Sequence, residues 1–480
     1  MTHPALGAID RAAEKLCKMS DAVWETPETA FSEHKSVETL IAGLKDLGFE
    51  VTEKLAGIDT AFCGRYGSGK PVIGFLGEFD ALSGLSQISG IAEKKPLAEG
   101  AAGHGCGHNL LGVGAIGAAV ALKEYIETTG CQGTVVFYGC PGEEGGSGKA
   151  FMARDGVFDE LDCAITWHPW DANRASNETS LANYQVAYKF KGISSHAASS
   201  PHLGRSALDA VELMNVGVQF LREHVVDSVR IHYAITDSGG YSPNVVQPKA
   251  EVLYLIRAKD NVQLAELYQR VNKIAQGAAL MTETELEIDF IKACSNMVCN
   301  TTLLKLLQES LETVERPQYT EEDIRYAKEI QATLGDIPNR YAVELNRHDD
   351  EGKKFLKEHF DGRPIFDFVF PYAHVEGDLG GSTDVGDVSW ICPTAQILAV
   401  TEAALTPGHS WQETAQGKSP IAHEGMIYAA KAMADTAIKL FEKPELIEQA
   451  KKEHAERLDG AKYECAIPKE VRPRAIAPKK

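Results

Sequence analysis

The sequence lacks an excess of basic residues. Its 480 residues include 48 Lys and Arg against 68 Asp and Glu, which gives a formal net charge of -20. A nucleic-acid surface needs Lys and Arg gathered on one face, so this composition argues against a nucleic-acid partner. The same net charge provides no long-range attraction for an anionic substrate. Any acidic ligand must therefore be met by local positive charge, from metal ions or a buried Arg.

Targeting and membrane signals are also missing. The amino terminus reads MTHPALGAIDRAAEKL, without the basic segment and the apolar run of about 7–15 residues that a signal peptide needs. The most apolar stretch, Leu110 to Leu122, is too short to span a bilayer and is rich in Gly and Ala, so it predicts a buried helix. We therefore expect a cytoplasmic protein with no membrane role.

A disulfide framework is absent as well. Ten cysteines are scattered without paired spacings, in a chain long enough to need no covalent staples, so we expect most of them to be small buried hydrophobic residues. We find no internal repeat and no low-complexity tract. The length exceeds the limit of about 250–300 residues for one core, which predicts two structural units or one heavily inserted domain.

Short apolar runs suggest an α/β sheet. Val135 to Tyr138 and Cys163 to Trp167 each end where a polar or Gly-rich segment begins, which is typical of buried parallel strands. Helices from about Asp10 to Leu47, with a break around Pro27, and from Leu110 to Tyr125 would cover its faces. Ligands bind beyond the carboxyl ends of such strands, where the segments HGCGHN and PGEEGGSG are expected to lie.

A different pattern runs from Leu181 to Ser295. Its periodicities predict the order β-α-β-β-α-β, which matches a ferredoxin-like split βαβ unit inserted into a larger domain. We therefore predict a catalytic domain in two halves, 1–182 and 297–480, and an inserted domain at 183–296. The predicted insert elements are Tyr184 to Phe190, Ser206 to Leu221, Arg230 to Ile235, Ala250 to Arg257, Val262 to Ala279 and Glu285 to Ile291.

The second half of the catalytic domain is less regular. Asn300 is a plausible helix cap at its start. Between about Val314 and Tyr372 the sequence becomes charged and irregular, which we interpret as a solvated excursion with one or two surface helices. The final stretch, 462–480, is rich in Pro and Lys and is expected to fray or to wrap over the surface.

Several metal-ligand side chains follow the predicted strands. Cys106 and His108 stand two apart in a Gly-rich turn, although on local evidence alone a chance cluster or a Cys-His nucleophile is as good an interpretation. Glu143 and Glu144 would usually be a solvated turn, but they follow the apolar run VVFYGC. One of them can then ligate a metal while the other accepts a proton from water. His168 stands at the end of a buried strand, which favours a ligand over a core histidine.

Seven segments in order carry a resemblance to a known family. They resemble the amidohydrolase branch of the aminoacylase and carboxypeptidase G metallopeptidases, with coverage from about Trp24 to Met433. This resemblance implies an α/β fold: a metallopeptidase catalytic domain with an open mixed sheet and an inserted ferredoxin-like α+β dimerisation or lid domain. The segments are HGCGHN, LLGVGAIGAA, PGEEGGSGKAFM, WHP, SSHAASSPHLGRSALDA, SPNVVQPKAEVLYLIR and STDVGDVSW.

The resemblance also implies roles for individual residues. Glu143 would be the general base, and Asp80 would orient a metal-bound histidine. Asn109 and Glu78 depart from the family's usual Asp at both positions, which puts the surroundings of the ligands in doubt. Five residues would hold the metals, with the first as the bridging ligand: Cys106, His108, Glu144, His168 and His409.

Three residues of the insert are implied at the substrate. His196 would donate to the developing oxyanion, and Asn244 and Arg257 would bind the substrate's carboxylate. The family often brings such residues to the metal site of a partner chain. From local sequence alone, a turn cap for Asn244, a surface charge for Arg257 and a helix-start cap for His196 are equally good interpretations.

The activity implied is hydrolysis of a linear amide bond. Two divalent ions, Zn or Mn, would activate water, and the substrate would be a small N-acyl or N-aroyl amino acid. A broader aminoacylase, a metal-bound protein without turnover and a Cys106-nucleophile enzyme are the alternatives. The expected partner is a second copy in a homodimer, or a homologous chain in a hetero-oligomer.

Overall fold

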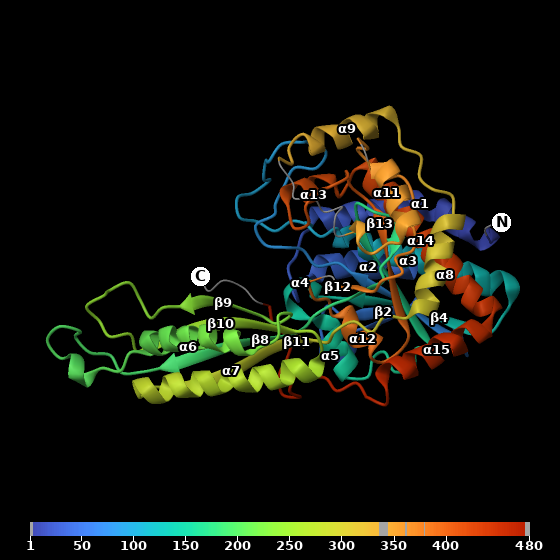
Figure 1. The fold of residues 1–480 in the computed structure, drawn as a ribbon. Helices are drawn as coiled ribbons and strands as arrows, with labels where there is room; N and C mark the ends of the chain where they lie inside the picture. The colour runs from blue at the N-terminus through green and yellow to red at the C-terminus, as the bar shows by residue number, and fades with distance from the viewer. Residues whose placement is uncertain (1–2, 336–343, 361, 379, 476–480) are drawn as a thin grey trace.

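A computed structural model of the chain describes residues 3–335, 344–360, 362–378 and 380–475. Figure 1 shows a larger unit built around a seven-stranded sheet and a smaller, elongated unit that projects from it. The smaller unit contains a four-stranded sheet and two helices. The predicted fold class, an α/β catalytic domain with an inserted α+β domain, is confirmed.

The large sheet has the order β1-β2-β4-β3-β5-β13-β6. Its centre is parallel, because β3 pairs with β4 and β5, and β5 pairs with β13, in the same direction. The edges are antiparallel, so the sheet is mixed, as expected. A separate parallel pair joins β7 and β12. The strands are β1 (Glu50–Glu53), β2 (Phe62–Ser68), β3 (Val72–Glu78), β4 (Gly133–Cys140), β5 (Cys163–Trp170), β6 (Arg174–Ala175), β7 (Glu178–Thr179), β12 (Gly377–Asp378) and β13 (Thr394–Val400).

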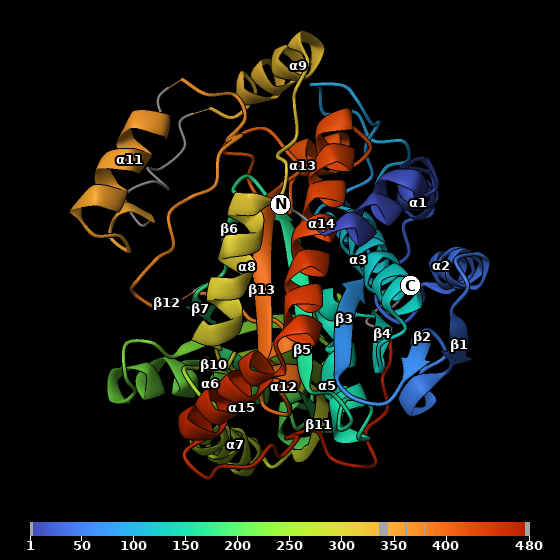
Figure 2. The same ribbon diagram turned by 90° about the vertical axis from the view of Figure 1, so that its right-hand side faces the viewer.

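Helices cover this sheet, and Figure 2 shows α3, α8 and α14 lying along one face of it. The predicted buried helix is α3, and Pro27 lies between α1 and α2 as expected. Asn300 caps α8 by accepting a hydrogen bond from Leu303 N at 3.1 Å. The helices are α1 (Gly7–Glu25), α2 (His34–Asp46), α3 (His108–Thr129), α4 (Glu143–Gly146), α5 (Gly148–Arg154), α8 (Thr301–Thr313), α9 (Glu321–Gln331), α11 (Asp350–Phe360), α12 (Val385–Ser389), α13 (Trp411–Gln416), α14 (Pro420–Glu442) and α15 (Pro444–Leu458).

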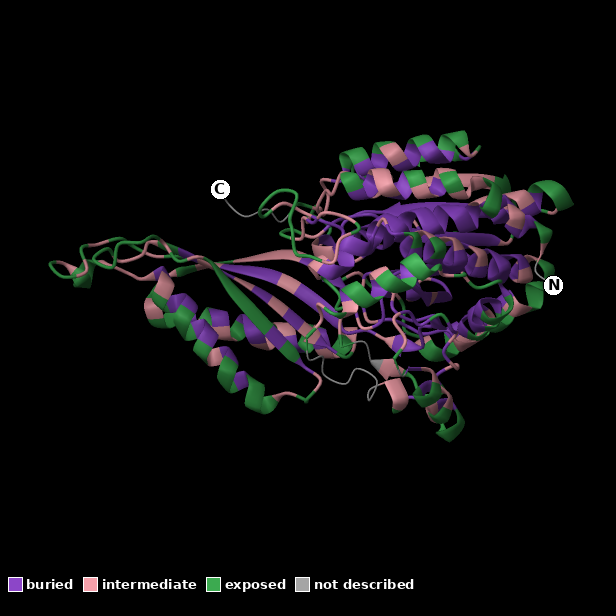
Figure 3. Ribbon diagram, turned by 90° about the horizontal axis from the view of Figure 1, so that it is seen from above, coloured by how far each residue is buried: buried purple, intermediate pink, exposed green. Residues whose placement is uncertain are grey.

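The insert forms an antiparallel sheet in the order β11-β8-β10-β9. All six predicted elements are present in the predicted order. One face of the sheet is covered by the two helices (Figure 3), and the alternating burial of β10 shows the other face to be more open. The elements are β8 (Ala182–Lys191), α6 (Ala207–Leu221), β9 (Arg230–Asp237), β10 (Lys249–Ala258), α7 (Asn261–Thr282) and β11 (Glu285–Cys294).

The charged region after α8 differs from the expectation. Its described part does contain surface helices, among them α9 and α11, but it is not simply a solvated excursion. Phe360, Phe366, Phe368 and Phe370 are buried together in a second hydrophobic core, which explains how this segment packs without a long strand. Residues 336–343 and 361, which the same prediction included, lie outside the described residues.

The segment after α15 crosses both units. Arg154 of α5 donates hydrogen bonds to the carbonyl oxygens of Pro468 and Val471 at 3.1 and 2.9 Å. Farther along, Arg474 pairs with Asp289 of the insert at 2.8 Å. The expectation that this stretch wraps over the surface is confirmed for 462–475, and 476–480 lie outside the described residues.

Two expectations about apolar residues can also be compared with the structure. Within the described chain, α3 is the one helix long and apolar enough to cross a membrane, and 83% of its most apolar window is buried, as in a core helix. The ten cysteines are all unpaired. Five are buried and five are only partly buried, so burial holds for half of them and not for most.

Candidate metal centre

The candidate site forms where four strands of the large sheet end. Cys106 and His108 flank Gly107, which begins α3 with a left-handed φ of +67°. A side chain at Gly107 would meet Pro169 of β5 at 2.7 Å, so glycine is required here. His168 precedes Pro169, and the glutamates of α4 follow β4. The carboxyl ends of β3, β4, β5 and β13 thus converge on one place.

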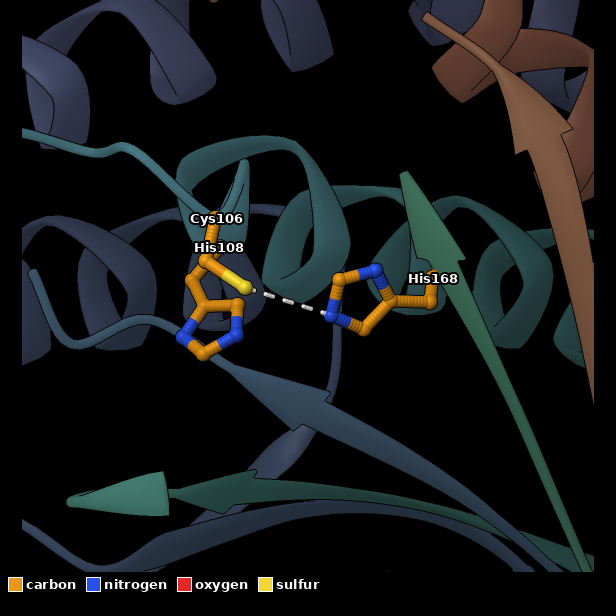
Figure 4. A group of neighbouring side chains, drawn as sticks. All are labelled: Cys106, His108 and His168. Carbon is orange, nitrogen blue, oxygen red and sulfur yellow. Dashed lines mark hydrogen bonds between the residues drawn. The ribbon is translucent and has the colours of Figure 1, made fainter. Parts of the chain in front are cut away.

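Two groups of potential ligands meet at Cys106. The first contains Cys106, His108 and His168, and the second contains Cys106, Glu144 and His409, with the ligand atoms of each group within 4.8 Å of one another. Figure 4 shows the Cys106 sulfur between the two imidazoles of the first group, 3.5 Å from His168 Nε2. All five ligand candidates are therefore brought together. Cys106 stands in the position that a ligand shared by two metals would occupy.

Hydrogen bonds fix which nitrogen of two histidines faces the centre. His168 Nδ1 donates to the carbonyl oxygen of Pro169 at 2.8 Å, so its Nε2 is left unprotonated when the ring is neutral. His108 Nδ1 lies 3.1 Å from Asp80 Oδ1, and Asp80 Oδ2 accepts from the backbone N of Glu144 at 2.9 Å. Asp80 thus holds one ligand of each group. This pattern is common around protein metal sites.

Two buried ligand atoms lack a hydrogen-bond partner among the described residues. They are Nε2 of His108 and Oε1 of Glu144. His409 Nε2 approaches Glu144 Oε1 to 3.3 Å, but without the geometry of a hydrogen bond. A buried polar atom without a partner is costly, and a cation between these atoms would remove that cost. Thiolate, imidazole and carboxylate ligands all suit Zn, and carboxylates also suit Mn, so the residues fit the implied metals.

The charges around the centre also favour a cation. Burial disfavours an imidazolium at His108, but the hydrogen bond to Asp80 and the charge of Glu78 outweigh it and raise the pKa of His108 well above its usual value. Burial disfavours the Glu144 carboxylate too, yet His409 and His108 lower the pKa of Glu144 to about 2. The surrounding carboxylates therefore stabilise positive charge at the place where the ligand atoms converge.

Glu143 differs from its neighbour. Burial, followed by the charges of Glu78 and Glu144, raises the pKa of Glu143 well above its usual value. Its carboxylate makes no hydrogen bond to any other residue that the structure describes, although it lies within 4.8 Å of a His108 nitrogen. A carboxylate held beside the ligands but not engaged by them can accept a proton from a water molecule.

A buried ion cluster stands behind Glu143, and the sequence motifs did not reveal it. Lys149 is fully buried, and its Nζ lies 2.6 Å from both Glu78 Oε1 and Asp384 Oδ1. Glu78 also forms a third potential metal group with His108 and Glu143. Because Lys149 already compensates its charge, we favour the two groups that share Cys106. Lys149 stands in the motif KAFM and Asp384 in STDVG, but these motifs are far apart in the sequence. The sequence therefore gave no sign that the two residues are in contact.

The three residues expected at the substrate are separated. Arg257 lies at the base of the insert and donates to Ser382 Oγ of the catalytic unit at 2.8 Å. His196 and Asn244 lie together at the far end, where Ala197 N donates to Asn244 O at 2.9 Å. The 10 residues of β8 span about 30 Å between these ends. His196 and Asn244 therefore do not reach the metal ligands of their own chain.

The geometry thus defines a class: an α/β metallohydrolase with a paired-metal centre at the end of its sheet and a projecting inserted domain. Residues 74–367 match peptidase family M20/M25/M40, and the chain belongs to this family. The predicted resemblance is confirmed, and it extends to one particular relative, as the sequence motifs also suggested.

That relative is one of two named subunits of the p-aminobenzoyl-glutamate hydrolase of Escherichia coli (strain K12). It is 49% identical over 468 residues, which are 97% of this chain and 97% of the relative. The other subunit of that hydrolase is 25% identical over 47% of this chain and 53% of its own length. Xaa-Arg dipeptidase of Mus musculus is 28% identical over 93% of this chain and 90% of its own length.

A solved structure agrees with the fold. The YXEP protein of Bacillus subtilis, described as a dinuclear metal binding peptidase, is 16% identical with a TM-score of 0.55. The match covers 90% of this chain and 99% of the other. At that identity it shows the fold alone.

Proposed function

We propose that this protein hydrolyses the amide bond of p-aminobenzoyl-glutamate, releasing p-aminobenzoate and glutamate. The observation that carries the proposal is that two groups of metal-ligand side chains share Cys106. Beside them lies Glu143, whose carboxylate makes no hydrogen bond to any other residue that the structure describes. The substrate is the one for which the 49% identical relative is named. Two divalent ions, Zn or Mn, would be held by Cys106, His108 and His168 on one side and by Cys106, Glu144 and His409 on the other.

The residues of this chain divide the chemistry among them. When bound, the metals lower the pKa of water and polarise the scissile carbonyl. Glu143 takes the proton of the attacking water and returns it to the leaving amine of glutamate, so no covalent intermediate is needed. Asp80 keeps the His108 ring and the Glu144 backbone in place. Arg257 meets a carboxylate of the substrate at the base of the insert.

Activity of the metal-loaded chain tests this proposal. We expect hydrolysis of p-aminobenzoyl-glutamate that a chelator abolishes and that added Zn or Mn restores. A Cys106-nucleophile enzyme would survive chelation, and this result would overturn the metal mechanism. Hydrolysis of other N-acyl amino acids at equal rates would favour the broader aminoacylase instead. Cleavage of dipeptides ending in Arg would favour the activity named for the mouse relative.

The proposal also includes a partner chain and a cell compartment for the enzyme. The relative is named as one subunit of an enzyme with a second, homologous one, which supports an assembly with a homologous chain, and a homodimer is the alternative. The separation of His196 and Asn244 from the metal ligands of their own chain supports either assembly, because both residues are placed to reach a second chain. The unpaired state of all ten cysteines supports a reducing compartment such as the cytoplasm.

A further inference from the structure

The open face of the insert sheet carries a second cation near Arg257. Lys292 of β11 and Arg257 of β10 both lie on this face at the base of the insert, on either side of β8. The ladder pairs Arg257 with Asn183 and Lys292 with Gln185, so two strand spacings of about 4.8 Å separate the cations across the sheet. Figure 1 shows the base of the insert beside α4, α5 and α12.

Each of these cations donates a hydrogen bond to a hydroxyl group of the catalytic unit. Lys292 Nζ donates to Ser147 Oγ at 3.2 Å, and Arg257 Nη1 donates to Ser382 Oγ at 2.8 Å. Ser147 directly follows α4, which carries Glu143 and Glu144. Both cations therefore reach from the insert to the catalytic unit, and Lys292 does so next to the turn that carries Glu143 and Glu144.

Lys292 is buried without a compensating charge. It is 8% exposed, and no carboxylate pairs with it among the described residues. The contrast with Lys149 is informative, because that buried ammonium lies 2.6 Å from two carboxylates. An isolated buried ammonium is costly. This cost is removed if an anion binds beside the Lys292 ammonium.

Resting on the proposed function, we propose that Lys292 determines specificity by binding the side-chain carboxylate of the substrate while Arg257 binds its α-carboxylate. The substrate class is then the N-acyl dicarboxylic amino acids, with glutamate as the released product. An amino acid with one carboxylate would engage Arg257 and leave Lys292 unpaired. Lys292 does not take part in the proton transfers, which stay with Glu143.

A pair of substrates that differ by one charge tests this assignment. The kcat/KM of p-aminobenzoyl-glutamate is compared with that of p-aminobenzoyl-glutamine, whose scissile bond is the same and whose side chain is a neutral amide. We expect the wild type to prefer the glutamate conjugate by about 10- to 100-fold, the range for a hydrogen bond to a charged group. In Lys292→Met this preference should disappear through a higher KM for the glutamate conjugate alone.

Matched variants separate charge recognition from folding. Lys189 of β8 lies on the same face of the insert sheet as Lys292 but pairs with Glu287 and Asp289. Lys189→Met should therefore keep the preference for the glutamate conjugate. Lys292→Gln repeats the test with a polar side chain if Lys292→Met does not fold. Lys292→Arg should restore most of the preference. Metal content should equal that of the wild type in every variant.

The outcomes against the proposal are distinct from a failure of the proposed function. A wild type that cleaves both conjugates equally, or a Lys292 variant that loses both activities in parallel, would overturn the specificity role and leave the hydrolase intact. If neither conjugate is cleaved, calorimetric binding of the two conjugates decides. A preference for the glutamate conjugate that Lys292→Met removes would support the role, and equal affinities would overturn it.

Discussion

Glu143 and Glu144 are neighbours in sequence with opposite electrostatic surroundings. Two histidines lower the pKa of Glu144, whereas burial and further carboxylates raise the pKa of Glu143. Carboxylates whose pKa values are pushed apart usually serve different roles in catalysis. The ionised Glu144 suits a metal ligand, and Glu143, with its higher proton affinity, suits a group that takes and returns a proton.

Exchanging each glutamate for its amide tests this division. Glu143→Gln should retain both metals and lose about 10²- to 10⁴-fold in kcat, the usual contribution of a general base. Glu144→Gln is the matched control, because it should lose metal as well as activity. Metal content by elemental analysis and turnover of p-aminobenzoyl-glutamate are measured on both. Near-normal turnover in Glu143→Gln would remove Glu143 from the proton-transfer role.

Cys106 is the residue that the two ligand groups share. Cys106→Ala should therefore lower the content of both metals, whereas His168→Ala should affect mainly the group to which His168 belongs. Elemental analysis of dialysed protein measures the difference. A Cys106→Ala protein with full metal content and only a modest loss of rate would contradict a shared ligand. It would leave a structural role for the thiol.

The metal-ligand candidates that stood in short motifs are brought together as expected, whereas residues linked only by tertiary contact were not predicted from the sequence. Glycine turns and strand ends point Cys106, His108 and the α4 glutamates to one place by local geometry. Lys292 gave no signal, because in IDFIKACS it is one polar residue in a strand. Its meaning depends on Ser147, which lies 145 residues away. Sequence periodicity carries no information about such a contact.

Among the elements, the buried cluster joins β3, α5 and the start of α12. Lys149 of α5 lies between Glu78, the last residue of β3, and Asp384, which precedes α12 and also accepts from Lys149 N at 2.8 Å. α5 directly follows the turn that carries Glu143 and Glu144. The cluster therefore fixes this turn against the sheet.

Removing the charge of Lys149 should destabilise the catalytic unit. Lys149→Met removes the ammonium that two buried carboxylates share, and breaking such a buried ion pair typically costs about 3–5 kcal/mol. Lys18→Met, which breaks an exposed pair with Glu14 on α1, is the matched control and should leave the free energy of unfolding nearly unchanged. Urea unfolding followed by tryptophan fluorescence measures both. A similar small effect in the two variants would show that the cluster does not hold these elements.

Element by element, the insert was more predictable than the region after α8. Strand alternation and helical spacing agree throughout the insert, because one face of its sheet is covered and the other is open. In the region after α8, charged residues on α9 and α11 suggested a solvated surface. The phenylalanines that form the second core lie partly outside regular elements, so neither a period of 2 nor one of 3.6 identified them.

At the scale of the whole molecule, the insert has an apolar edge. β9 is the last strand of its sheet and exposes Tyr233 and Ile235, and the neighbouring α6 exposes Val216 and Phe220. An exposed edge strand beside an apolar helix face favours association with another chain. This feature agrees with a dimer formed through the insert.

Charged substitutions on this edge should give a monomer. The double change Val216→Glu and Phe220→Glu places like charges on the exposed face of α6, where neither side chain supports the core. Light scattering of the purified protein measures its mass in solution. The matched control is Val262→Glu with Leu280→Glu, at exposed positions of α7, and it should leave the dimer intact. A dimer that persists in the α6 variant would place the interface elsewhere.

Because His196 lies about 30 Å along β8 from the base of the insert, it can serve a metal centre only on a partner chain. Its Nδ1 accepts from the backbone N–H groups of Ala198 and Ser199, so Nε2 is left to donate outward.

Mixing two inactive variants tests whether His196 serves a partner chain. We expect the Glu143→Gln protein and the His196→Ala protein each to be inactive alone. When the two chains are mixed and allowed to exchange, each mixed dimer holds one site with an intact Glu143 and an intact His196 from its partner. About a quarter of the wild-type activity should return if pairing is random. A His196→Ala protein with full activity, or a mixture no more active than its components, would mean that each chain works with its own residues alone.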